Sequence, residues 1–296
     1  MARTHTLKLP GVDLVYDIHG PLPAETGREP LLMIGQPMDA SGFASLVAQF
    51  PDRTVVTYDP RGFGRSVRSD GESSHQPRTN ADDVHAVIEA LGVGPVELFA
   101  SSGGAITALA LVAQFGDDVV TAVAHEPPLI YLLPDAIPAE RAYAAVRSRY
   151  RDHGWGTGMA EFLKMSSWAG EFTQAYFDLP PADPAAFGVP TEDDGSRDDP
   201  LLSERFESMV AFRPDVHALR AAPTSLLIAV GEESRGTLTG RTAEATAKAL
   251  GREAVVFPSH HAGFAGGEFG QSGQPEAFGR RLRAVLDGVR SASPPR

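Results

Sequence analysis

The chain has 296 residues, with 26 Lys or Arg against 38 Asp or Glu, so its formal net charge is −12. Apolar residues make up 42% of it, which is enough for the core of one large or two small globular domains. This acidic charge argues against nucleic acid or an anionic membrane as partner, because both attract basic surfaces. The absence of cysteine excludes disulfides, thiolate-bound metals and a cysteine nucleophile. We therefore expect a small, uncharged ligand.

The amino terminus and one uncharged segment bear on where the protein works. Residues 1–10 mix charges with short apolar stretches and lack the apolar region and cleavage site of a secretory signal. Residues 98–116 carry no charge, but a tandem Ser-Ser-Gly-Gly near their start favours a buried strand, a turn and a helix over a membrane span. We expect a cytoplasmic protein that binds neither membranes nor nucleic acid.

In chain order, the first 125 residues alternate strand and helix patterns. Short apolar or alternating runs predict strands over residues 12–18, 31–34, 54–58, 96–100 and 119–125. Apolar residues at helical spacing predict helices over residues 41–50, 80–91 and 103–115, the second of them capped by Asn80 and ended by Gly92. Strands that alternate with helices imply a parallel sheet with right-handed crossovers.

The pattern changes after residue 128. Helices without strands are predicted near residues 139–150, 159–177 and 201–212. Strands over residues 225–230 and 254–257 then resume, with helices over residues 242–250 and 275–289. We predict an α/β core domain of residues 1–130 and 214–290, a helical cap insertion of residues 131–213 and a frayed tail of residues 291–296.

The loop at residues 190–200 carries five acidic side chains, a composition that attracts cations. However, Gly195 does not stand in the register of a calcium-binding loop, and no later Glu is placed to complete such a site. The sequence therefore favours a solvent-exposed loop, and we expect no metal site.

The segment from Ala100 to Gly104 lies where a buried strand turns directly into a helix. Such a turn lifts a serine hydroxyl above the sheet, next to a helix N-terminus that favours developing negative charge. The crowded backbone needs very small residues two positions before and two positions after the nucleophile. Ser102 meets this requirement with Ala100 and Gly104, whereas Ser101 would place Phe99 at a crowded position. We therefore predict Ser102 as the nucleophile.

A histidine pair follows the last predicted strand, where a loop would reach the same edge of the sheet as the serine. Histidine can accept the serine proton and return it to a leaving group near neutral pH. We predict His261 as the base, with His260 as its neighbour. A chance pair of surface histidines is the structural alternative.

The acid of a catalytic triad has two candidate positions. After the first strand that follows the insertion, the chain carries Glu232 and Glu233, but Ser234 stands where an aspartate is expected. The strand before the insertion ends in His-Glu-Pro-Pro, so that two rigid prolines hold Glu126 at the end of the sheet. We prefer Glu126 as the acid and keep Glu232 and Glu233 as alternatives.

An oxyanion would need two backbone donors. The amide of Gly103, which follows the nucleophile, is one candidate, and the amide of Gln36 in the turn Ile-Gly-Gln-Pro is the other. The segment at residues 58–66, Tyr-Asp-Pro-Arg-Gly-Phe-Gly-Arg-Ser, is interpreted as a structural turn at the end of a strand.

Taken together, these segments make the chain resemble the α/β-hydrolase family. They are Ile-Gly-Gln-Pro (34–37), the turn at 58–66, Ala-Ser-Ser-Gly-Gly-Ala (100–105), His-Glu-Pro-Pro (125–128) and His-Ala-Gly-Phe (261–264), in the family's order. They frame residues 10–132 and 222–288. The resemblance implies a mostly parallel sheet of roughly eight strands with helices on both faces and a helical cap.

Within this family, an acid directly after residue 125 is similar to the arrangement in the zearalenone-type lactone hydrolases and in some haloalkane dehalogenases. The dehalogenases and epoxide hydrolases use aspartate as the nucleophile, whereas this chain has Ser102 at that position. The resemblance therefore implies hydrolysis of a carboxylic ester or lactone of a small, largely apolar substrate through an acyl-enzyme.

No metal or organic cofactor is needed for this reaction. The same triad would also suit a carbon–carbon bond hydrolase or a cofactor-free perhydrolase, and a catalytically silent ligand-binding protein of the same fold is the alternative from another class. The sequence leaves open whether the chain forms a homodimer.

Aromatic residues of the predicted insertion have two readings. Trp155, Trp168 and Tyr176, together with Phe172 and Phe177, either line an apolar substrate pocket or form the core of the cap.

Overall fold

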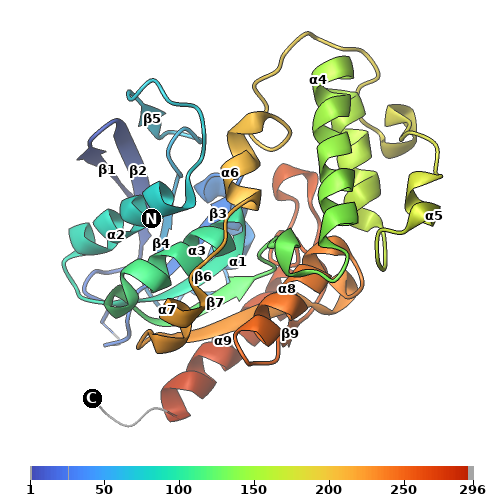
Figure 1. Cartoon of the computed structure of the whole chain (residues 1–296). Helices are drawn as coiled ribbons and strands as arrows, with labels where there is room; N and C mark the ends of the chain where they lie inside the picture. Colours follow the sequence, from blue (N-terminus) through green and yellow to red (C-terminus); the bar gives the residue numbers. More distant parts are fainter. Residues whose placement is uncertain (1, 26, 293–296) are drawn as a thin grey trace.

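The computed structural model describes residues 2–25 and 27–292, which are built around one β-sheet (Figure 1). Its strands are β1 (Arg3–Leu9), β2 (Val12–His19), β3 (Leu31–Gln36), β4 (Val55–Tyr58), β5 (Val67–Arg68), β6 (Val96–Ser102), β7 (Val119–His125), β8 (Ser225–Gly231) and β9 (Val255–Phe257). Their order is β1-β2-β4-β3-β6-β7-β8-β9, with β5 paired to β2. The pairs that involve β2 are antiparallel, and every neighbouring pair from β4 to β9 is parallel. The predicted mostly parallel sheet is therefore confirmed.

The α-helices are α1 (Ala44–Val47), α2 (Pro77–Leu91), α3 (Gly103–Gln114), α4 (Ala136–Ser167), α5 (Gln174–Phe177), α6 (Glu207–Val210), α7 (Val216–Ala221), α8 (Leu238–Ala249) and α9 (Pro275–Ala292). Short 3-10 helices are η1 (Ala40–Phe43), η2 (Gly116–Asp118), η3 (Ile130–Leu132), η4 (Pro184–Phe187), η5 (Glu204–Phe206), η6 (Glu232–Ser234) and η7 (Glu268–Gly270).

The central strand β6 illustrates why helices cover both faces of the sheet. Successive side chains of a strand point to opposite faces. Leu98 and Ala100 join a buried apolar cluster that includes α2, α3 and α8, whereas Phe99 joins a second cluster that includes α9. All three side chains are completely buried. The helices predicted on both faces are therefore confirmed.

Some elements begin at other residues than the pattern predicts. The helix expected to start after Asn80 begins at Pro77, because proline suits the first helical position, where no N–H partner is needed. Asn80 lies inside α2, and its buried side chain donates a hydrogen bond of 2.9 Å to Gln36 Oε1. Strand β1 has no counterpart among the predicted strands, because its mostly exposed side chains form no apolar pattern.

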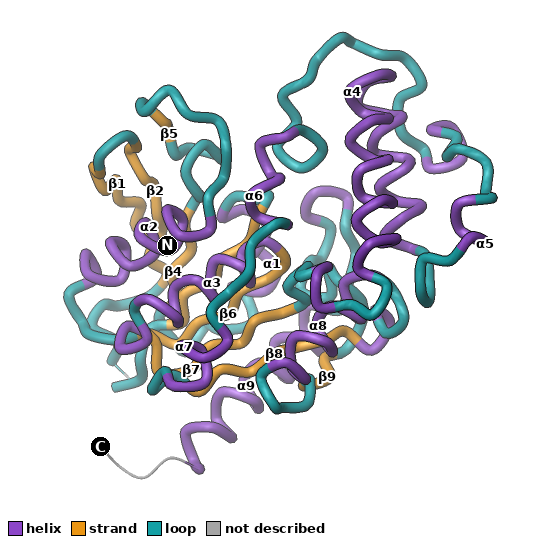
Figure 2. The backbone as a smooth tube through the Cα atoms, in the orientation of Figure 1, coloured by secondary structure: helices purple, strands orange, loops and turns teal. Residues whose placement is uncertain are grey.

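The region between β7 and β8 is helical, as predicted, and its helices α4 and α5 lie to one side of the strands (Figure 2). Gly154 has φ 84° and ψ −176°, which breaks α4 into two limbs. A Cβ atom added to Gly158 would lie 2.5 Å from Cβ of Tyr150, so the second limb folds back closely against the first. The second limb ends at Ser167 rather than at residue 177.

In place of one helix over residues 201–212, the structure has two short helices, the 3-10 helix η5 and the four-residue helix α6. Ser291 and Ala292 continue α9, and the other residues of the predicted tail, 293–296, lie outside the described part of the chain. Within the described ranges, no helix combines the length and the apolar character that crossing a membrane requires.

Candidate active site

Ser102 ends β6 and directly precedes α3, at the carboxyl edge of the parallel strands. Its backbone has φ 57° and ψ −124°, a strained conformation for a residue with a side chain. Strain of this kind is typical of a nucleophile elbow, which exposes the hydroxyl above the sheet. The pairing of β3 with β6 places Gln36 in register with Ser102.

The turn around Ser102 has no space for larger residues on its α3 side. A Cβ atom on Gly104 would lie 2.6 Å from the carbonyl oxygen of Ile34, and one on Gly103 would lie 2.8 Å from the carbonyl oxygen of Gln36. These neighbours are backbone atoms, which cannot rotate away as a flexible side chain could. Glycine therefore allows α3 to approach β3 closely and keeps the Gly103 backbone beside Gln36.

The predicted contact between His261 and Glu126 is present in the structure. Nδ1 of His261 lies 2.6 Å from Oε2 of Glu126. Glu126 directly follows β7 and is completely buried, whereas the His261 side chain is 39% exposed. The carboxylate can therefore fix the orientation and tautomer of an imidazole whose opposite edge stays accessible.

Two further donors hold the Glu126 carboxylate. The Gly231 amide donates to Oε1 at 2.8 Å, and the Thr239 hydroxyl donates to Oε2 at 2.6 Å. Burial raises the pKa of Glu126, but the imidazoles of His125 and His261 and these hydrogen bonds outweigh it, so the pKa lies well below its ordinary value. Glu126 is therefore ionised at neutral pH.

The alternative acids are placed differently. Glu232 and Glu233 are exposed, and among the described residues neither forms a hydrogen bond with His261. The end of β8 instead contributes the Gly231 amide, which binds Glu126. The sequence left Glu232 and Glu233 as alternatives for the acid of the triad, and the geometry favours Glu126.

His260 anchors the loop after β9. Its Nε2 atom lies 3.1 Å from the carbonyl oxygen of Ser272, and its Nδ1 accepts from the Ala262 amide at 3.1 Å. Both ring nitrogens are thus engaged with the backbone, which leaves His261 as the histidine available for proton transfer.

Ser102 and His261 line one cavity of about 600 Å³. Within the described residues they share no hydrogen bond, although such contacts are often long before a substrate binds. Gln36 lines the same cavity, so the predicted nucleophile, base and one oxyanion donor meet there.

The predicted pocket aromatics do not line this cavity. Trp155 donates to Asp199 Oδ2 at 2.9 Å, Trp168 donates to the Glu171 carbonyl oxygen at 3.1 Å, and Tyr176 is buried in the apolar cluster of the helical region. The aromatic lining comes instead from Tyr143, Phe162, Phe187, Phe206, Phe264 and Phe269. The spacing of aromatic residues along the sequence does not show which of them line the cavity, because helices and loops that are distant in sequence enclose it together.

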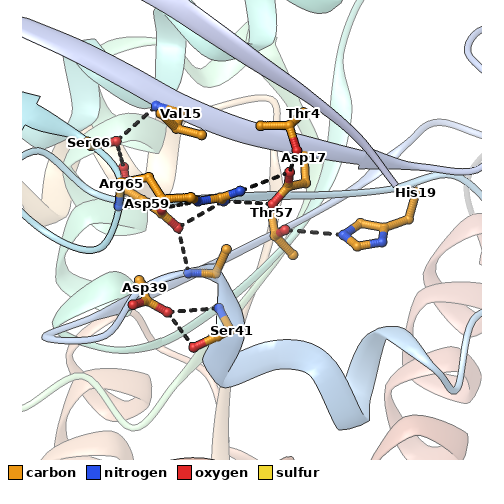
Figure 3. A network of polar contacts seen from close by, with 11 residues as sticks. Thr4, Val15, Asp17, His19, Asp39, Ser41, Thr57, Asp59, Arg65 and Ser66 are labelled. Atoms are coloured by element: carbon orange, nitrogen blue, oxygen red, sulfur yellow. Dashed lines mark hydrogen bonds and ion pairs between the residues drawn. The ribbon is translucent and has the colours of Figure 1, made fainter. Parts of the chain in front are cut away.

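The turn at residues 58–66 supports the loop that follows β3 (Figure 3). Arg65 donates hydrogen bonds of 2.7 Å to both Asp59 and Asp17. Asp59 also accepts from the Ala40 amide at 2.9 Å, which ties this turn to the start of η1. These contacts confirm the predicted structural role of the turn.

Two residues beside Glu126 were not among the predicted site residues. Thr239 lies on α8, 113 positions away in sequence, so no local pattern could indicate its contact. His125 directly precedes Glu126, and its Nδ1 lies 3.1 Å from the Ser101 hydroxyl. The adjacent His-Glu pair is the signal that could have identified it.

The acidic loop at residues 190–200 is tied to its surroundings by local contacts. Asp193 forms an ion pair of 2.7 Å with Arg197, and Asp199 accepts from the amides of Leu201 and Leu202. In the described part of the chain, no three His, Asp or Glu side chains are grouped so that they could hold a metal ion.

The chain matches one protein family and is similar to several known proteins. The model of the family described as "Alpha/beta hydrolase family" matches residues 19–278. Uncharacterized hydrolase YraK of Bacillus subtilis (strain 168) is 27% identical over 266 residues, which cover 88% of this chain and 89% of that protein. The bifunctional esterase/perhydrolase DCH of Acinetobacter calcoaceticus is 35% identical over 141 residues, which cover 44% of this chain and 48% of that protein.

A solved structure shares the fold over nearly the whole chain. The thermophilic esterase from Thermogutta terrifontis superimposes with a TM-score of 0.64 at 21% identity, covering 98% of this chain and 99% of that chain.

Proposed function

This chain belongs to the alpha/beta hydrolase family, and we propose that it is a serine hydrolase of carboxylic esters or lactones. The observation that carries the proposal is the His261–Glu126 pair, with 2.6 Å between Nδ1 and Oε2, on the cavity that Ser102 also lines. The esterase activities named for DCH and for the Thermogutta enzyme support it.

In the proposed acylation step, Ser102 Oγ attacks the substrate carbonyl carbon while His261 Nε2 takes the hydroxyl proton. The carbonyl oxygen becomes an oxyanion, which the amides of Gln36 and Gly103 stabilise. The tetrahedral intermediate collapses, the carbon–oxygen bond to the leaving alcohol breaks, and the imidazolium protonates the departing oxygen. Ionised Glu126 stabilises the imidazolium throughout.

In the proposed deacylation step, His261 removes a proton from water, and the hydroxide attacks the acyl carbon. The bond from that carbon to Ser102 Oγ then breaks, the imidazolium returns its proton to Oγ, and the acid is released. With a lactone, the alcohol and the acid stay within one product molecule. The predominantly apolar lining favours substrates whose acyl or alcohol part is apolar.

A fluorophosphonate tests the activated serine directly. We expect one label per chain, located at Ser102 by peptide mapping, and no label in Ser102→Ala. Ser101→Ala is the matched control, because it removes the neighbouring hydroxyl and should still carry the label on Ser102. A folded wild-type protein that stays unlabelled and hydrolyses no ester would contradict the proposal.

A perhydrolase is the second candidate, because DCH is named as both esterase and perhydrolase. Product analysis separates the two activities. An ester incubated with hydrogen peroxide yields a peracid if the protein is a perhydrolase, and only the carboxylic acid if it is a hydrolase. Carbon–carbon cleavage would release a ketone or an aldehyde fragment instead. A silent binding protein would bind its ligand equally well as Ser102→Ala.

A further inference from the structure

Among the described residues, the permanently charged side chains that line the catalytic cavity are all negative. Glu233 and Glu268 line it together with His260 and His261, and within the described residues no Lys or Arg does. The other described lining residues are apolar or uncharged polar residues. From the described lining, a substrate thus meets fixed negative charge and no permanent positive charge.

Both carboxylates lack a positive partner in the described part of the chain. Glu268 accepts from the Ser45 amide at 2.7 Å and from the Gly266 amide at 2.5 Å. Burial opposes its ionisation, but these hydrogen bonds hold the pKa of Glu268 below its ordinary value, so it stays anionic. Glu233 is exposed and accepts only a weak contact of 3.4 Å from Gln274.

From this lining we infer that the enzyme selects uncharged or cationic esters and rejects esters that carry a carboxylate. The inference rests on the proposed function. Like charges repel more strongly beside low-dielectric walls than in water, and no cation among the described residues neutralises Glu233 or Glu268. The overall charge of −12 acts in the same direction at longer range.

Three thiobutyrate esters of similar size test this selection. They are 3,3-dimethylbutyl thiobutyrate, which is uncharged, butyrylthiocholine, its cationic counterpart, and the thiobutyrate of 4-sulfanylbutanoate, which is anionic. We expect kcat/KM for the anionic ester to be at least about tenfold below that for the uncharged ester, and the gap to narrow at high salt. The cationic ester should be hydrolysed at least as well as the uncharged one.

Glu268→Gln and Glu233→Gln supply the decisive comparison. Each should raise kcat/KM for the anionic ester more than for the uncharged ester, with unfolding temperatures measured alongside. Equal rates for anionic and uncharged esters in the wild type overturn the inference, as does an identical effect of both variants on the two esters. Failure of the proposed function looks different: the wild type then hydrolyses the uncharged ester no faster than Ser102→Ala.

A separate observation concerns the buried histidine next to the acid. His125 is completely buried, its Nδ1 lies 3.1 Å from Ser101 Oγ, and its Nε2 lies 3.7 Å from Glu126 Oε1. Nε2 has no hydrogen-bond partner in the described structure. Its ring stacks with that of His261 at a centroid distance of 6.0 Å.

The surroundings determine which nitrogen carries the proton. Burial lowers the pKa of His125 to about 4 against the opposing charge of Glu126, so the ring is neutral at pH 7 and has a single N–H. With the proton on Nδ1, the lone pair of Nε2 would face the Glu126 carboxylate and be repelled. With the proton on Nε2, the Ser101 hydroxyl donates to Nδ1 and the N–H faces Oε1.

We propose that His125, held by Ser101, is a positioning residue that keeps the Glu126 carboxylate aligned with His261. It acts on Oε1, the carboxylate oxygen that accepts the Gly231 amide, while His261 contacts Oε2, and at 3.7 Å its effect is an electrostatic contact and not a hydrogen bond. Partners that orient metal-binding side chains typically contribute about 10- to 100-fold to affinity or activity, and we expect an effect of the same order here.

His125→Leu and His125→Gln separate positioning from packing. We expect His125→Leu to lower kcat about 10- to 100-fold with KM within about twofold, and His125→Gln, which restores an N–H donor, to recover most of kcat. A folded His125→Leu with wild-type kcat overturns the proposal, as does a His125→Gln that is no more active than His125→Leu.

If His125→Leu does not fold, Ser101→Ala tests whether His125 positions Glu126. Removing the hydroxyl frees the ring of His125 to change tautomer, so kcat should fall several-fold at unchanged KM. A Ser101→Ala protein with wild-type kcat then overturns the proposal.

Discussion

Oε2 of Glu126 lies 2.6 Å from Nδ1 of His261, although 135 positions separate the two residues in the sequence. The carboxylate is buried and the imidazole partly exposed, so the pair joins the core of the sheet to the cavity. The same oxygen accepts the Thr239 hydroxyl, which fixes it further. This relationship leads directly to a test of the acid.

Glu126→Gln should lower kcat by about 10³- to 10⁴-fold, because the neutral amide cannot stabilise the imidazolium and permits the wrong tautomer. Steady-state hydrolysis of an uncharged ester measures the effect. Glu232→Gln is the matched control, since Glu232 is exposed and does not line the cavity. A larger loss in Glu232→Gln than in Glu126→Gln would reverse the assignment.

Gly104→Ala should destabilise the protein by about 1–3 kcal/mol and lower activity, because the new Cβ would lie 2.6 Å from the Ile34 carbonyl oxygen. Gly288→Ala is the control on the exposed surface of α9, where a Cβ would meet nothing within 4 Å. That variant should gain about 0.5–1 kcal/mol from helix propensity. Urea unfolding measures both changes, and equal stability of the two variants would refute the crowded turn.

Phe162→Ala should widen the cavity and raise kcat/KM for long-chain relative to short-chain esters by at least about threefold, because Phe162 lines the cavity. Trp168→Ala should leave the chain-length ranking unchanged, since the Trp168 ring packs edge-on against Tyr176 instead. Rates with a homologous series of p-nitrophenyl esters provide the measurement. A changed ranking in Trp168→Ala alone would place the specificity pocket elsewhere.

The free energy of unfolding should fall as the pH drops from about 6.5 to 4. Burial, with nearby Arg charges, lowers the pKa of His75 to about 4, and burial does the same for His125. Between pH 6.5 and 4, these histidines bind protons in the unfolded chain but not in the folded one. Each histidine therefore lowers the free energy of unfolding by up to about 1.4 kcal/mol for every pH unit of acidification in that range.

His75→Gln should make the dependence of stability on pH shallower between pH 6.5 and 4. Urea unfolding at several pH values measures the slope, and His217→Gln is the control because His217 is exposed. An unchanged slope in His75→Gln would show that His75 does not contribute.

Local patterns were sufficient for most of the sheet. The apolar run at residues 96–100 and the pattern at residues 119–125 correspond to β6 and β7, because a buried parallel strand needs a short, continuous apolar segment. Local patterns did not predict β1, because its side chains are mostly exposed and form no apolar pattern. They also failed for the start of α2, where Pro77 and not Asn80 begins the helix.

The sequence by itself determined the α/β class, the small-residue turn around Ser102 and the candidate partners His261 and Glu126, since these depend on the size and chemistry of neighbouring residues. Only the tertiary structure decided which acid contacts His261 and which aromatics enclose the cavity. Those outcomes depend on how β7, β8 and the loop after β9 meet at one edge of the sheet, and on where α4 reverses at Gly154. Contacts between segments far apart in the chain arise from packing, which no local pattern encodes.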